Sequence, residues 1–460
     1  DGWSMTTITM TELTSTNPAT GEVVGTVPVT PIDTIDEMFQ RSHAAQGPWS
    51  SLSLDERIDI LERVIPVLGG HAEEIGALIT AEMGKPLAEG IGEVQYGVDG
   101  MADNLDEIAL ALGSEEMQDG TTCSTLHRDP FGVCVAITPW NFPFLMVLQI
   151  VMPALAAGNT VVMKPSEMVP LTGQAFADAF NEVLPPDVLQ IVHGDDTQGK
   201  ALVAGDCDLI GFTGSRAAGQ HILSTAGKDL KRVVLELGGK DPMIVLDDAD
   251  VEAAASFATR NSFRNCGQVC VSTERIYVEP NIADAFETAV VKKTSELIVG
   301  NGADEGVQIG PMVSAEQKAH VLAQLERAKV DGAAVAYGDT PMDGNFVAPT
   351  VLTDLSHDMP IMVDETFGPV ACIVRVADAD EAVRLANDTP YGLGAAVFGH
   401  KDAERVARQL TAGMIGVNQG CGGASGTPWV GAGQSGYGYH GGRDGHRQFA
   451  QVRVVSRSCD

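Results

Sequence analysis

The chain has 460 residues and a formal net charge of −33, because 62 Asp and Glu stand against 29 Lys and Arg. Its length suggests about two to four domains, and its 44% hydrophobic content is typical of a globular chain with a large core. The acidic excess argues against a nucleic-acid-binding protein and against a polybasic membrane-surface protein, because both need clustered Lys and Arg.

The sequence also argues against several other classes of protein. No apolar run approaches the roughly 18–20 residues that a membrane-spanning helix needs. The first ten residues, DGWSMTTITM, have neither the basic start nor the apolar core of a secretory signal. Eight cysteines in a chain of this length do not make a disulfide scaffold, so we expect a reduced, cytoplasmic protein.

The first 110 residues follow a largely helical pattern. An amphipathic run opens at Ser53 and reaches Ile65, where Pro66 interrupts or ends it. A second run covers residues 71–83 and stops at Gly84-Lys85-Pro86, a glycine–proline stop signal. The N-terminal part of the chain is therefore predicted to be mainly helical.

From Val133 the pattern changes to short apolar runs that alternate with helical stretches. Continuous apolar strands separated by helices indicate a parallel sheet covered on both faces. That is a doubly wound α/β domain, whose ligand crevice lies at the carboxyl ends of its strands. The predicted strands are residues 133–137, 160–163, 189–192, 209–212 and 233–236, and the predicted helices lie near 144–157, 172–183 and 216–226.

A second α/β stretch begins near residue 243, with a strand at 243–246, a helix at 250–265, a strand at 274–278 and a helix at 283–297. The later segment 413–445 is rich in glycine, which is typical of a flexible linker. It also contains Trp429, Tyr437 and Tyr439, and a strand-like tail at 449–455 follows it. An ordered wrap around a site is therefore at least as well supported as a disordered linker.

Two cysteines, Cys266 and Cys270, lie four residues apart at a predicted helix-to-loop junction. A zinc site needs three or four ligands, and no further Cys or His lies nearby in sequence, so we predict no metal site. Taken alone, the segment favours ordinary buried cysteines over a catalytic thiol.

Three further motifs carry groups that suit catalysis or phosphate binding. Asn141, in TPWNFP at 138–143, follows a strand and could donate to an oxyanion, although an Asx-turn before proline is the common alternative. Glu236 ends an apolar strand, where a raised pKa would suit a general base, unless its carboxylate reaches solvent. Gly214 and Gly219 bracket a turn between strand and helix that could hold a pyrophosphate, but this spacing is weak evidence by itself.

Together and in this order, the motifs resemble those of the NAD(P)-dependent aldehyde dehydrogenases, including the succinate-semialdehyde and betaine-aldehyde dehydrogenases. The resemblance spans nearly the whole chain. Its motifs are NPATGE at residue 17, EMGKP at 82, TPWNFP at 138, KPSE at 164, FTGS at 212, LELGGK at 235, NCGQVC at 265, ETFGPV at 365 and SGYG at 435.

The resemblance implies roles for individual residues. Cys270 matches the nucleophile, Asn141 the oxyanion-holding amide and Glu236 the general base, whereas Cys266 lies at a variable motif position. The positions implied in cofactor binding are Thr138, Pro139, Trp140, Lys164, Ser166, Glu167, Gly199, Gly214, Ser215, Leu237, Glu365 and Phe367. The positions implied in substrate binding are Arg264, Phe142, Gln149 and Trp429.

These roles imply oxidation of an aldehyde to a carboxylic acid through a cysteine thioester, with hydride transfer to the nicotinamide. The coenzyme A-acylating relatives usually lack a glutamate at the position of Glu236, so hydrolysis of the thioester is favoured. A non-enzymatic relative would be expected to have lost the nucleophile, the base or the oxyanion donor, and all three are intact here.

Cofactor preference follows from Glu167, because a carboxylate beside the ribose accepts from its hydroxyls and repels a 2′-phosphate. We therefore expect NAD, with NADP as an alternative that Lys164 could tolerate.

Substrate choice depends on Arg264, six residues before the nucleophile. Betaine-aldehyde dehydrogenases carry Trp there, as part of an aromatic box for a cation, whereas succinate-semialdehyde dehydrogenases carry one of two arginines that hold a carboxylate. Arg264 thus favours an acidic or neutral aldehyde, including a semialdehyde, unless it is merely a surface Arg at a helix end. The match is incomplete, since the second Arg falls at Gln149 and the small hydroxyl residue at Gly423.

The family architecture implies an α/β fold with a Rossmann-like NAD-binding domain (5–115 and 133–236), an α/β catalytic domain (237–440) and a small β oligomerisation arm (116–132 and 441–460). A strand pair in such an arm has unpaired edges that a second subunit would cover, so a homodimer or homotetramer is expected. Cys266 adds a separate hypothesis, a reversible disulfide that protects Cys270 from over-oxidation, against the alternative of an inert neighbour.

Overall fold

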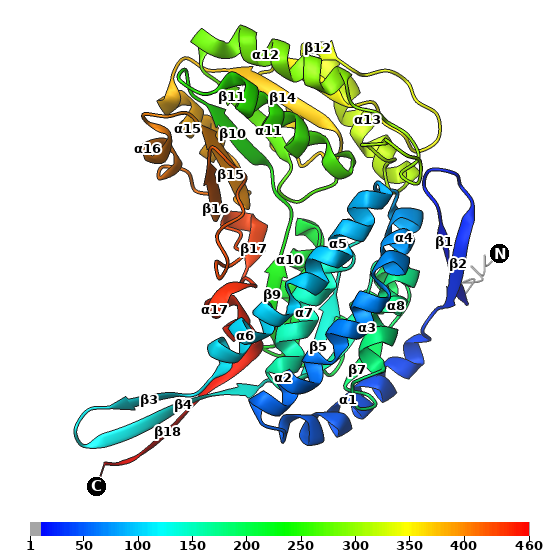
Figure 1. The fold of residues 1–460 in the computed structure, drawn as a ribbon, viewed down its shortest axis with the longest axis vertical. Coiled ribbons are helices and arrows are strands. Elements are labelled where there is room, and N and C mark those ends of the chain that lie inside the picture. The colour runs from blue at the N-terminus through cyan, green and yellow to red at the C-terminus, as the bar shows by residue number, and fades with distance from the viewer. Residues whose placement is uncertain (1–10, 460) are drawn as a thin grey trace, which may run out of the picture.

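The computed structural model describes residues 11–459, so the segment in which we looked for a secretory signal lies outside the described residues. The described chain forms two large sheets, a three-stranded sheet that projects from the body and a two-stranded hairpin (Figure 1). No helix within residues 11–459 is both long and apolar enough to cross a membrane.

The first large sheet has six strands, and all but one of its pairings are parallel. Residues of β5 alternate between two cores, with Cys134 and Ala136 on one face and Val133 and Val135 on the other, as the two-residue period of a strand requires. The order is β17 (Gly436–Tyr437), β9 (Arg232–Glu236), β8 (Leu209–Thr213), β5 (Val133–Ile137), β6 (Thr160–Lys164) and β7 (Leu189–Ile191).

Helices cover both faces of this sheet, as the sequence predicts for a doubly wound domain. One core packs the sheet against the helices α2 (Leu54–Glu62), α3 (Val64–Gly70), α4 (Ala72–Met83), α5 (Leu87–Asp99), α6 (Met101–Leu112), α7 (Leu145–Ala156) and α8 (Pro170–Asn181). The other packs it against α1 (Ile35–Ser50), α9 (Asp196–Ala204) and α10 (Arg216–Ala226).

The second large sheet has seven strands, parallel except for the edge strand β12. Its order is β12 (Ala334–Tyr337), β13 (Thr350–Thr353), β14 (Val370–Arg375), β11 (Thr273–Val278), β10 (Asp241–Val245), β15 (Gly394–Phe398) and β16 (Met414–Val417). Around it lie the helices α11 (Val251–Phe263), α12 (Pro280–Ser295), α13 (Ala315–Val330), α14 (Pro360–Val363), α15 (Ala379–Asn387) and α16 (Ala403–Ala407).

The predicted helix after Ser53 is split in two. Helix α2 ends at Glu62, and Pro66 lies in the first turn of α3. A proline ring clashes with the carbonyl four residues before it, which here belongs to Glu62, so a single continuous helix is disfavoured at this point. The stop after Met83 is confirmed, because Gly84 takes a left-handed conformation, with φ of 91°.

Two elements near the N-terminal half were not predicted. The first is the hairpin of β1 (Glu12–Thr16) and β2 (Val23–Pro28), and the second is the short helix α9. The glycine-rich segment is ordered rather than a featureless linker, because it contains β16, β17 and α17 (Gly442–His446). Its strand β17 crosses over to pair with β9 of the first sheet.

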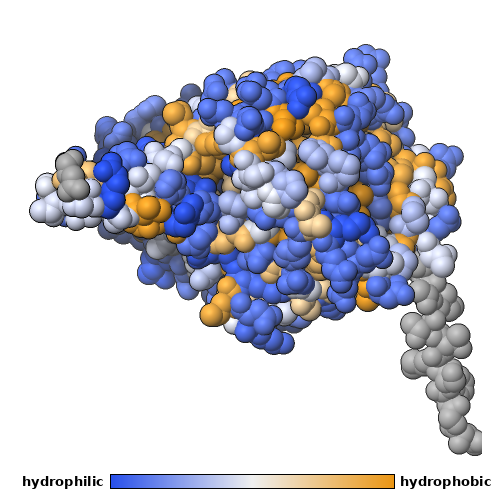
Figure 2. Space-filling view, turned by 90° about the horizontal axis from the view of Figure 1, so that it is seen from below, coloured by the Kyte–Doolittle hydropathy of each residue, from blue (hydrophilic) through white to orange (hydrophobic). Residues whose placement is uncertain are grey.

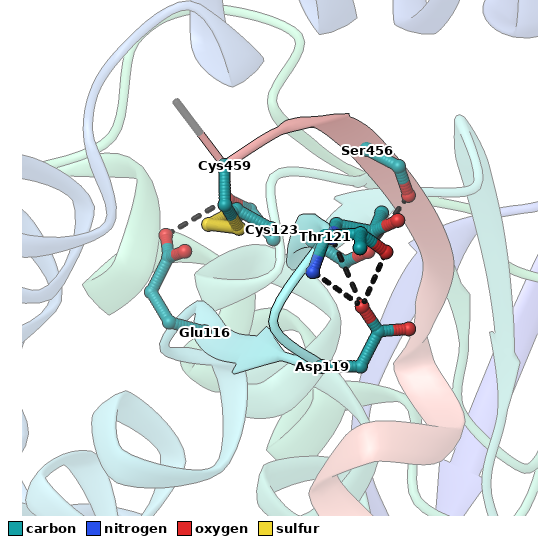
Figure 3. The surroundings of a disulfide bond; sticks show 9 residues. Glu116, Asp119, Thr121, Cys123, Ser456 and Cys459 are labelled. Carbon is teal, nitrogen blue, oxygen red and sulfur yellow. Dashed lines mark hydrogen bonds between the residues drawn. A yellow bond between two sulfur atoms is a disulfide. The ribbon is translucent and has the colours of Figure 1, made fainter.

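The projecting sheet consists of β3 (Glu115–Gln118), β4 (Thr122–Pro130) and β18 (Ala450–Ser458), and we call it the arm. Strand β18 pairs with the whole of β4 in antiparallel register. This pairing brings Cys459 beside Cys123, 336 residues away, and the two form a disulfide (Figure 3). The expectation of a fully reduced chain is therefore wrong at this pair, which sequence spacing could not reveal.

Candidate active site

A cavity of about 1560 Å³ lies where the carboxyl ends of the first sheet's strands face the second sheet and the glycine-rich segment. It brings together residues from motifs that are far apart in the chain. Of the residues singled out from the sequence, those that line it are Pro139, Trp140, Asn141, Phe142, Gln149, Gly214, Ser215, Glu236, Leu237, Arg264, Cys270, Glu365, Phe367 and Trp429.

Cys270 reaches the cavity because of the unusual backbone before it. Asn265, Cys266 and Gly267 are three consecutive residues with positive φ, between 50° and 71°. A Cβ on Gly267 would lie 2.0 Å from the carbonyl oxygen of Gly368, so glycine is needed there both for conformation and for space. This tight turn between α11 and β11 presents the Cys270 side chain to the cavity.

Glu236 ends β9 and lies beside Cys270. Its Oε1 accepts a hydrogen bond of 3.0 Å from the indole Nε1 of Trp429, and its buried Oε2 has no partner within residues 11–459. Burial raises the pKa of Glu236 to about 7, whereas the neighbouring Trp429 indole and Cys270 thiol act to lower it. Such a carboxylate exchanges its proton near neutral pH, as a general base must.

The Cys270 thiol is not activated by its protein surroundings. Burial raises its pKa well above the ordinary value, and the nearby carboxyl groups of Glu236 and Asp241 raise it further. In the protein alone the thiol form therefore dominates at neutral pH.

Asn141 is buried next to the nucleophile loop. Its side-chain Nδ2 donates to the carbonyl oxygen of Gln268 at 3.1 Å. The backbone carbonyl oxygen of Asn141 accepts hydrogen bonds from Lys85 Nζ at 2.8 Å and from Asn265 Nδ2 at 3.2 Å. The amide that could stabilise an oxyanion is thus attached to the same loop that carries Cys270.

One wall of the cavity suits a dinucleotide. Gly214 and Ser215 precede α10, and the backbone N–H groups of that helix start lie at the cavity, where an anion is favoured. Across from them, Glu365 Oε1 accepts from the Gly239 N–H at 3.0 Å, and burial raises the pKa of Glu365 to about 8. Phe367 packs edge-on against Trp140, with ring centroids 5.5 Å apart.

The remaining residues implied in cofactor binding gather beside the cavity rather than on its wall. The Thr138 N–H donates to the Lys164 carbonyl at 3.1 Å, Lys164 Nζ lies 3.9 Å from Glu167 Oε2, and Ser166 Oγ donates to the same carboxylate. A Cβ on Gly199 would contact the Lys164 side chain. The buried Thr138 hydroxyl has no partner within residues 11–459. That hydroxyl, just after β5, is a polar group that a bound ligand could satisfy.

Arg264 follows the last residue of α11 and is exposed to the cavity. Its guanidinium carbon lies 5.7 Å from the centre of the Phe142 ring, and it forms no ion pair among residues 11–459. Gly423, at the position where the family resemblance implies a small hydroxyl residue, lines the same cavity, as does Ser425 two residues later. An unpaired cation at this wall is available to an anionic group of a substrate.

Several lining residues were missed from the sequence. Glu93, Arg260 and His440 line the cavity, and Lys85 binds the Asn141 carbonyl behind it. Lys85 could have been suspected, because a lysine between the helix-stopping Gly84 and Pro86 has no role in the stop itself. The others carry no motif, since a fold places them there from separate helices and turns.

The structure does not favour Cys266 as a redox partner of the nucleophile. Its Sγ is fully buried in the core of the second sheet, 3.5 Å from the Sδ of Met312. Cys270 instead packs with a separate small apolar cluster, and Cys421 packs against that same cluster.

Comparisons with known proteins agree with this geometry. The model of the aldehyde dehydrogenase family matches residues 5–455. A probable succinate-semialdehyde dehydrogenase [NADP(+)] of Sinorhizobium fredii is 39% identical over 95% of this chain and 91% of its own length. A glutarate-semialdehyde dehydrogenase of Pseudomonas putida is 35% identical over 96% and 93%.

Among solved structures, betaine aldehyde dehydrogenase from Staphylococcus aureus with NAD⁺ aligns with a TM-score of 0.92, 31% identity and coverage of 98% of this chain and 94% of its own. With a family match across nearly the whole chain, and with Cys270, Glu236 and Asn141 gathered in one cavity, the chain belongs to the aldehyde dehydrogenase family and is an NAD(P)-dependent oxidoreductase.

Proposed function

We propose that Cys270 is the nucleophile, Asn141 the oxyanion donor and Glu236 the general base of a hydrolytic aldehyde oxidation. The observation that carries this proposal is that Cys270 lies in the cavity beside the buried Glu236, whose pKa is raised to about 7. A base with that pKa is poised to accept a proton at neutral pH. The same assignment follows from the family motifs in which these residues stand.

The Cys270 sulfur attacks the aldehyde carbon, and its thiol proton is lost to water. The oxyanion so formed accepts a hydrogen bond from the Asn141 amide. A nicotinamide cofactor held beside Glu365 and Phe367 would supply the acceptor for the hydride that the substrate carbon loses. Glu236 then takes a proton from water, which attacks the thioester carbonyl and releases the carboxylic acid and the Cys270 thiol.

The proposed substrate is an aldehyde that also bears an anionic group, such as a semialdehyde of a dicarboxylic acid. Arg264, which lines the cavity and forms no ion pair with any residue that the structure describes, would hold that group. The semialdehyde dehydrogenases among the relatives support this class. The alternatives are a betaine-aldehyde-type cation, a coenzyme A-acylating reaction and a non-enzymatic structural relative.

A single assay separates these alternatives. Reduction of the cofactor is followed with succinate semialdehyde, a neutral aldehyde of equal length and betaine aldehyde, each with and without coenzyme A. We expect the highest kcat/KM with the anionic aldehyde, no dependence on coenzyme A and no activity in Cys270→Ala. A preference for betaine aldehyde would contradict the role of Arg264, and dependence on coenzyme A would contradict hydrolysis.

NAD is proposed as the preferred cofactor, with NADP also accepted. Glu167, 42% exposed at its side chain and 3.9 Å from Lys164 Nζ, would accept from ribose hydroxyls and repel a 2′-phosphate. Lys164 beside it would moderate that repulsion, and the NADP(+) in the name of the Sinorhizobium relative supports dual use.

We also propose that residues 5–115 and 133–236 bind the cofactor, that 237–440 carry the nucleophile, and that the arm joins subunits of a homodimer or homotetramer. Strand β18 has exposed Val452, Val454 and Val455 and pairs only with β4 among the described strands, which favours a second copy across it. A cytoplasmic location is retained as a proposal, although the disulfide of the arm is unusual for that compartment.

A further inference from the structure

The short connection Gly84-Lys85-Pro86 contains a group that the proposed chemistry does not use. Lys85 lies between α4 and α5, and its side chain is 1% exposed. Burying an ammonium group costs free energy unless partners satisfy it. Its partners therefore indicate what the lysine holds in place.

Lys85 Nζ is shared between two partners from different parts of the chain. It lies 2.6 Å from Oε2 of Glu93 on α5 and 2.8 Å from the backbone oxygen of Asn141. It also lies 4.1 Å from the centre of the Phe142 ring. The lysine is thus fixed against the two residues at the tip of the TPWNFP loop.

Glu93 completes the attachment from the other side of that loop. Its second oxygen, Oε1, accepts the N–H groups of Phe144 at 3.0 Å and Leu145 at 3.2 Å, where α7 begins. The Lys85–Glu93 pair therefore holds the loop on both sides of Pro143. Lys85 binds one carbonyl before the proline, and Glu93 binds two N–H groups after it. Charge-assisted hydrogen bonds of this kind are the stronger ones in proteins.

A second buried lysine–glutamate pair holds another loop of the cavity in the same way. Lys240 Nζ lies 2.5 Å from Glu274 Oε2 and 3.1 Å from Thr366 Oγ1. Glu274 accepts the N–H groups of Thr366 and Phe367 at 2.8 and 2.9 Å. Buried ion pairs contribute little net stability. The Lys85–Glu93 and Lys240–Glu274 pairs, however, each bind a backbone segment that includes a residue lining the cavity.

We propose that Lys85, held by Glu93, is a positioning residue that fixes the Asn141 amide for oxyanion stabilisation. This inference rests on the proposed role of Asn141. The Asn141 Nδ2 is directed to the Gln268 carbonyl of the nucleophile loop, and its backbone is fixed by Lys85 and Asn265. A displacement of about 1 Å at such a donor can cost about 10²-fold in rate.

A double-mutant cycle tests the inference. The variants are Lys85→Met, Asn141→Ala and the two combined, with kcat, both KM values and the pre-steady-state rate of cofactor reduction measured for each. We expect Asn141→Ala to lower kcat by about 10²–10³. Lys85→Met should lower kcat by at least about tenfold without raising KM for the cofactor, and should cost almost nothing further once Asn141 is alanine, because its effect runs through that amide.

Lys240→Met is the matched comparator, since it breaks the equivalent pair at the Thr366–Phe367 loop. In the combined Lys240→Met/Asn141→Ala variant, the fold-losses in kcat/KM of the two single variants should multiply, because the two substitutions act on separate loops. If Lys85→Met does not fold, Lys85→Met/Glu93→Gln removes both buried charges and takes its place in the cycle.

The outcomes are distinguishable. Losses from Lys85→Met and Asn141→Ala that multiply, or a Lys85→Met that lowers only the melting temperature, would overturn the positioning role and leave Asn141 as the oxyanion donor. An Asn141→Ala enzyme with nearly full kcat would overturn both that proposed role and the inference built on it. A Lys85 effect that disappears in the Asn141→Ala background supports both.

Discussion

At the scale of single residues, Glu236 connects burial with catalysis through its pKa. Because the base must be ionised to take a proton, and burial raises its pKa to about 7, we expect kcat to fall as the pH drops below about 7. Glu236→Gln should keep a burst of reduced cofactor but lose steady-state turnover by about 10²–10⁴. Stopped-flow and steady-state absorbance across the neutral pH range measure both quantities.

Two results would contradict this role of Glu236. One is full steady-state activity in Glu236→Gln. The other is a low-pH decline of kcat that has the same midpoint in the variant as in the unaltered enzyme, since another group would then be responsible.

Arg264 makes a second prediction at this scale. Arg264→Gln removes the unpaired guanidinium and should raise KM for an anionic semialdehyde by roughly 10–100-fold, equivalent to about 1.5–3 kcal/mol for a hydrogen bond to a charged group. KM for a neutral aldehyde should stay unchanged. Arg260→Gln is the matched control, because Arg260 lies one turn earlier on α11 and lines the same cavity. Equal losses in the two variants would indicate a general positive field instead of a specific contact.

At the scale of elements, the start of α2 shows how a local sequence signal fixes a boundary. The Ser53 hydroxyl accepts the Glu56 N–H at 3.2 Å, and the Glu56 carboxylate accepts the Ser53 N–H at 2.7 Å, which is a capping box. Ser53→Ala should lower the free energy of unfolding by about 1 kcal/mol, measured by chemical denaturation. Ser51→Ala, which removes a nearby hydroxyl that donates to the Pro48 carbonyl at 2.8 Å, should change the free energy of unfolding by less than about 0.5 kcal/mol. Equal effects would argue against the cap.

Elements with a strong local signal could be predicted from the sequence. The apolar run at 133–137 and the helix that follows Gly214 have the bounds expected for them, since burial on two faces or a serine cap defines each one. The β1–β2 hairpin was missed because most of its residues are exposed or half-buried, so little apolar alternation marks it. Helix α9 was missed because its first turns, DTQGK, are polar.

The residues of the site likewise divide into those that the sequence could predict and those that it could not. Cys270, Glu236 and Asn141 each stand in a recognisable motif, so a family resemblance could place them. The role of the Lys85–Glu93 pair could not be predicted in this way. Lys85 also binds Asn141, which is 56 residues away in sequence, and only the packing of α5 against α7 brings these residues together.

At the scale of the whole molecule, the net charge of −33 has to be reconciled with anionic ligands. Hydrophilic residues cover most of the surface in Figure 2. The cavity carries both signs of charge: Arg216, Arg260 and Arg264 line it with the start of α10, and acidic residues that include Glu89, Glu107 and Asp364 line it as well. Burial also raises the pKa of Glu236 to about 7 and of Glu365 to about 8, so these two carboxyl groups carry less negative charge at neutral pH than surface ones do. The arginines, the start of α10 and the raised pKa values of Glu236 and Glu365 therefore reduce the negative charge that a dinucleotide would meet in the cavity.

The arm makes the last prediction, because its disulfide ties the end of β18 to β4 (Figure 3). A bond that closes so long a loop stabilises the folded state by roughly 6 kcal/mol in the chain-entropy model. We expect the denatured protein, kept from reductant, to titrate as the six free cysteines found among the described residues, and the reduced protein to titrate as eight. Reductant should also lower the melting temperature and expose the end of β18 to proteolysis.

The double variant Cys123→Ser/Cys459→Ser is the control. It should titrate as six thiols with and without reductant, and reductant should not change its melting temperature. Eight thiols before reduction would contradict the bond, and dimer or tetramer mass measured with and without reductant would show whether it supports subunit assembly.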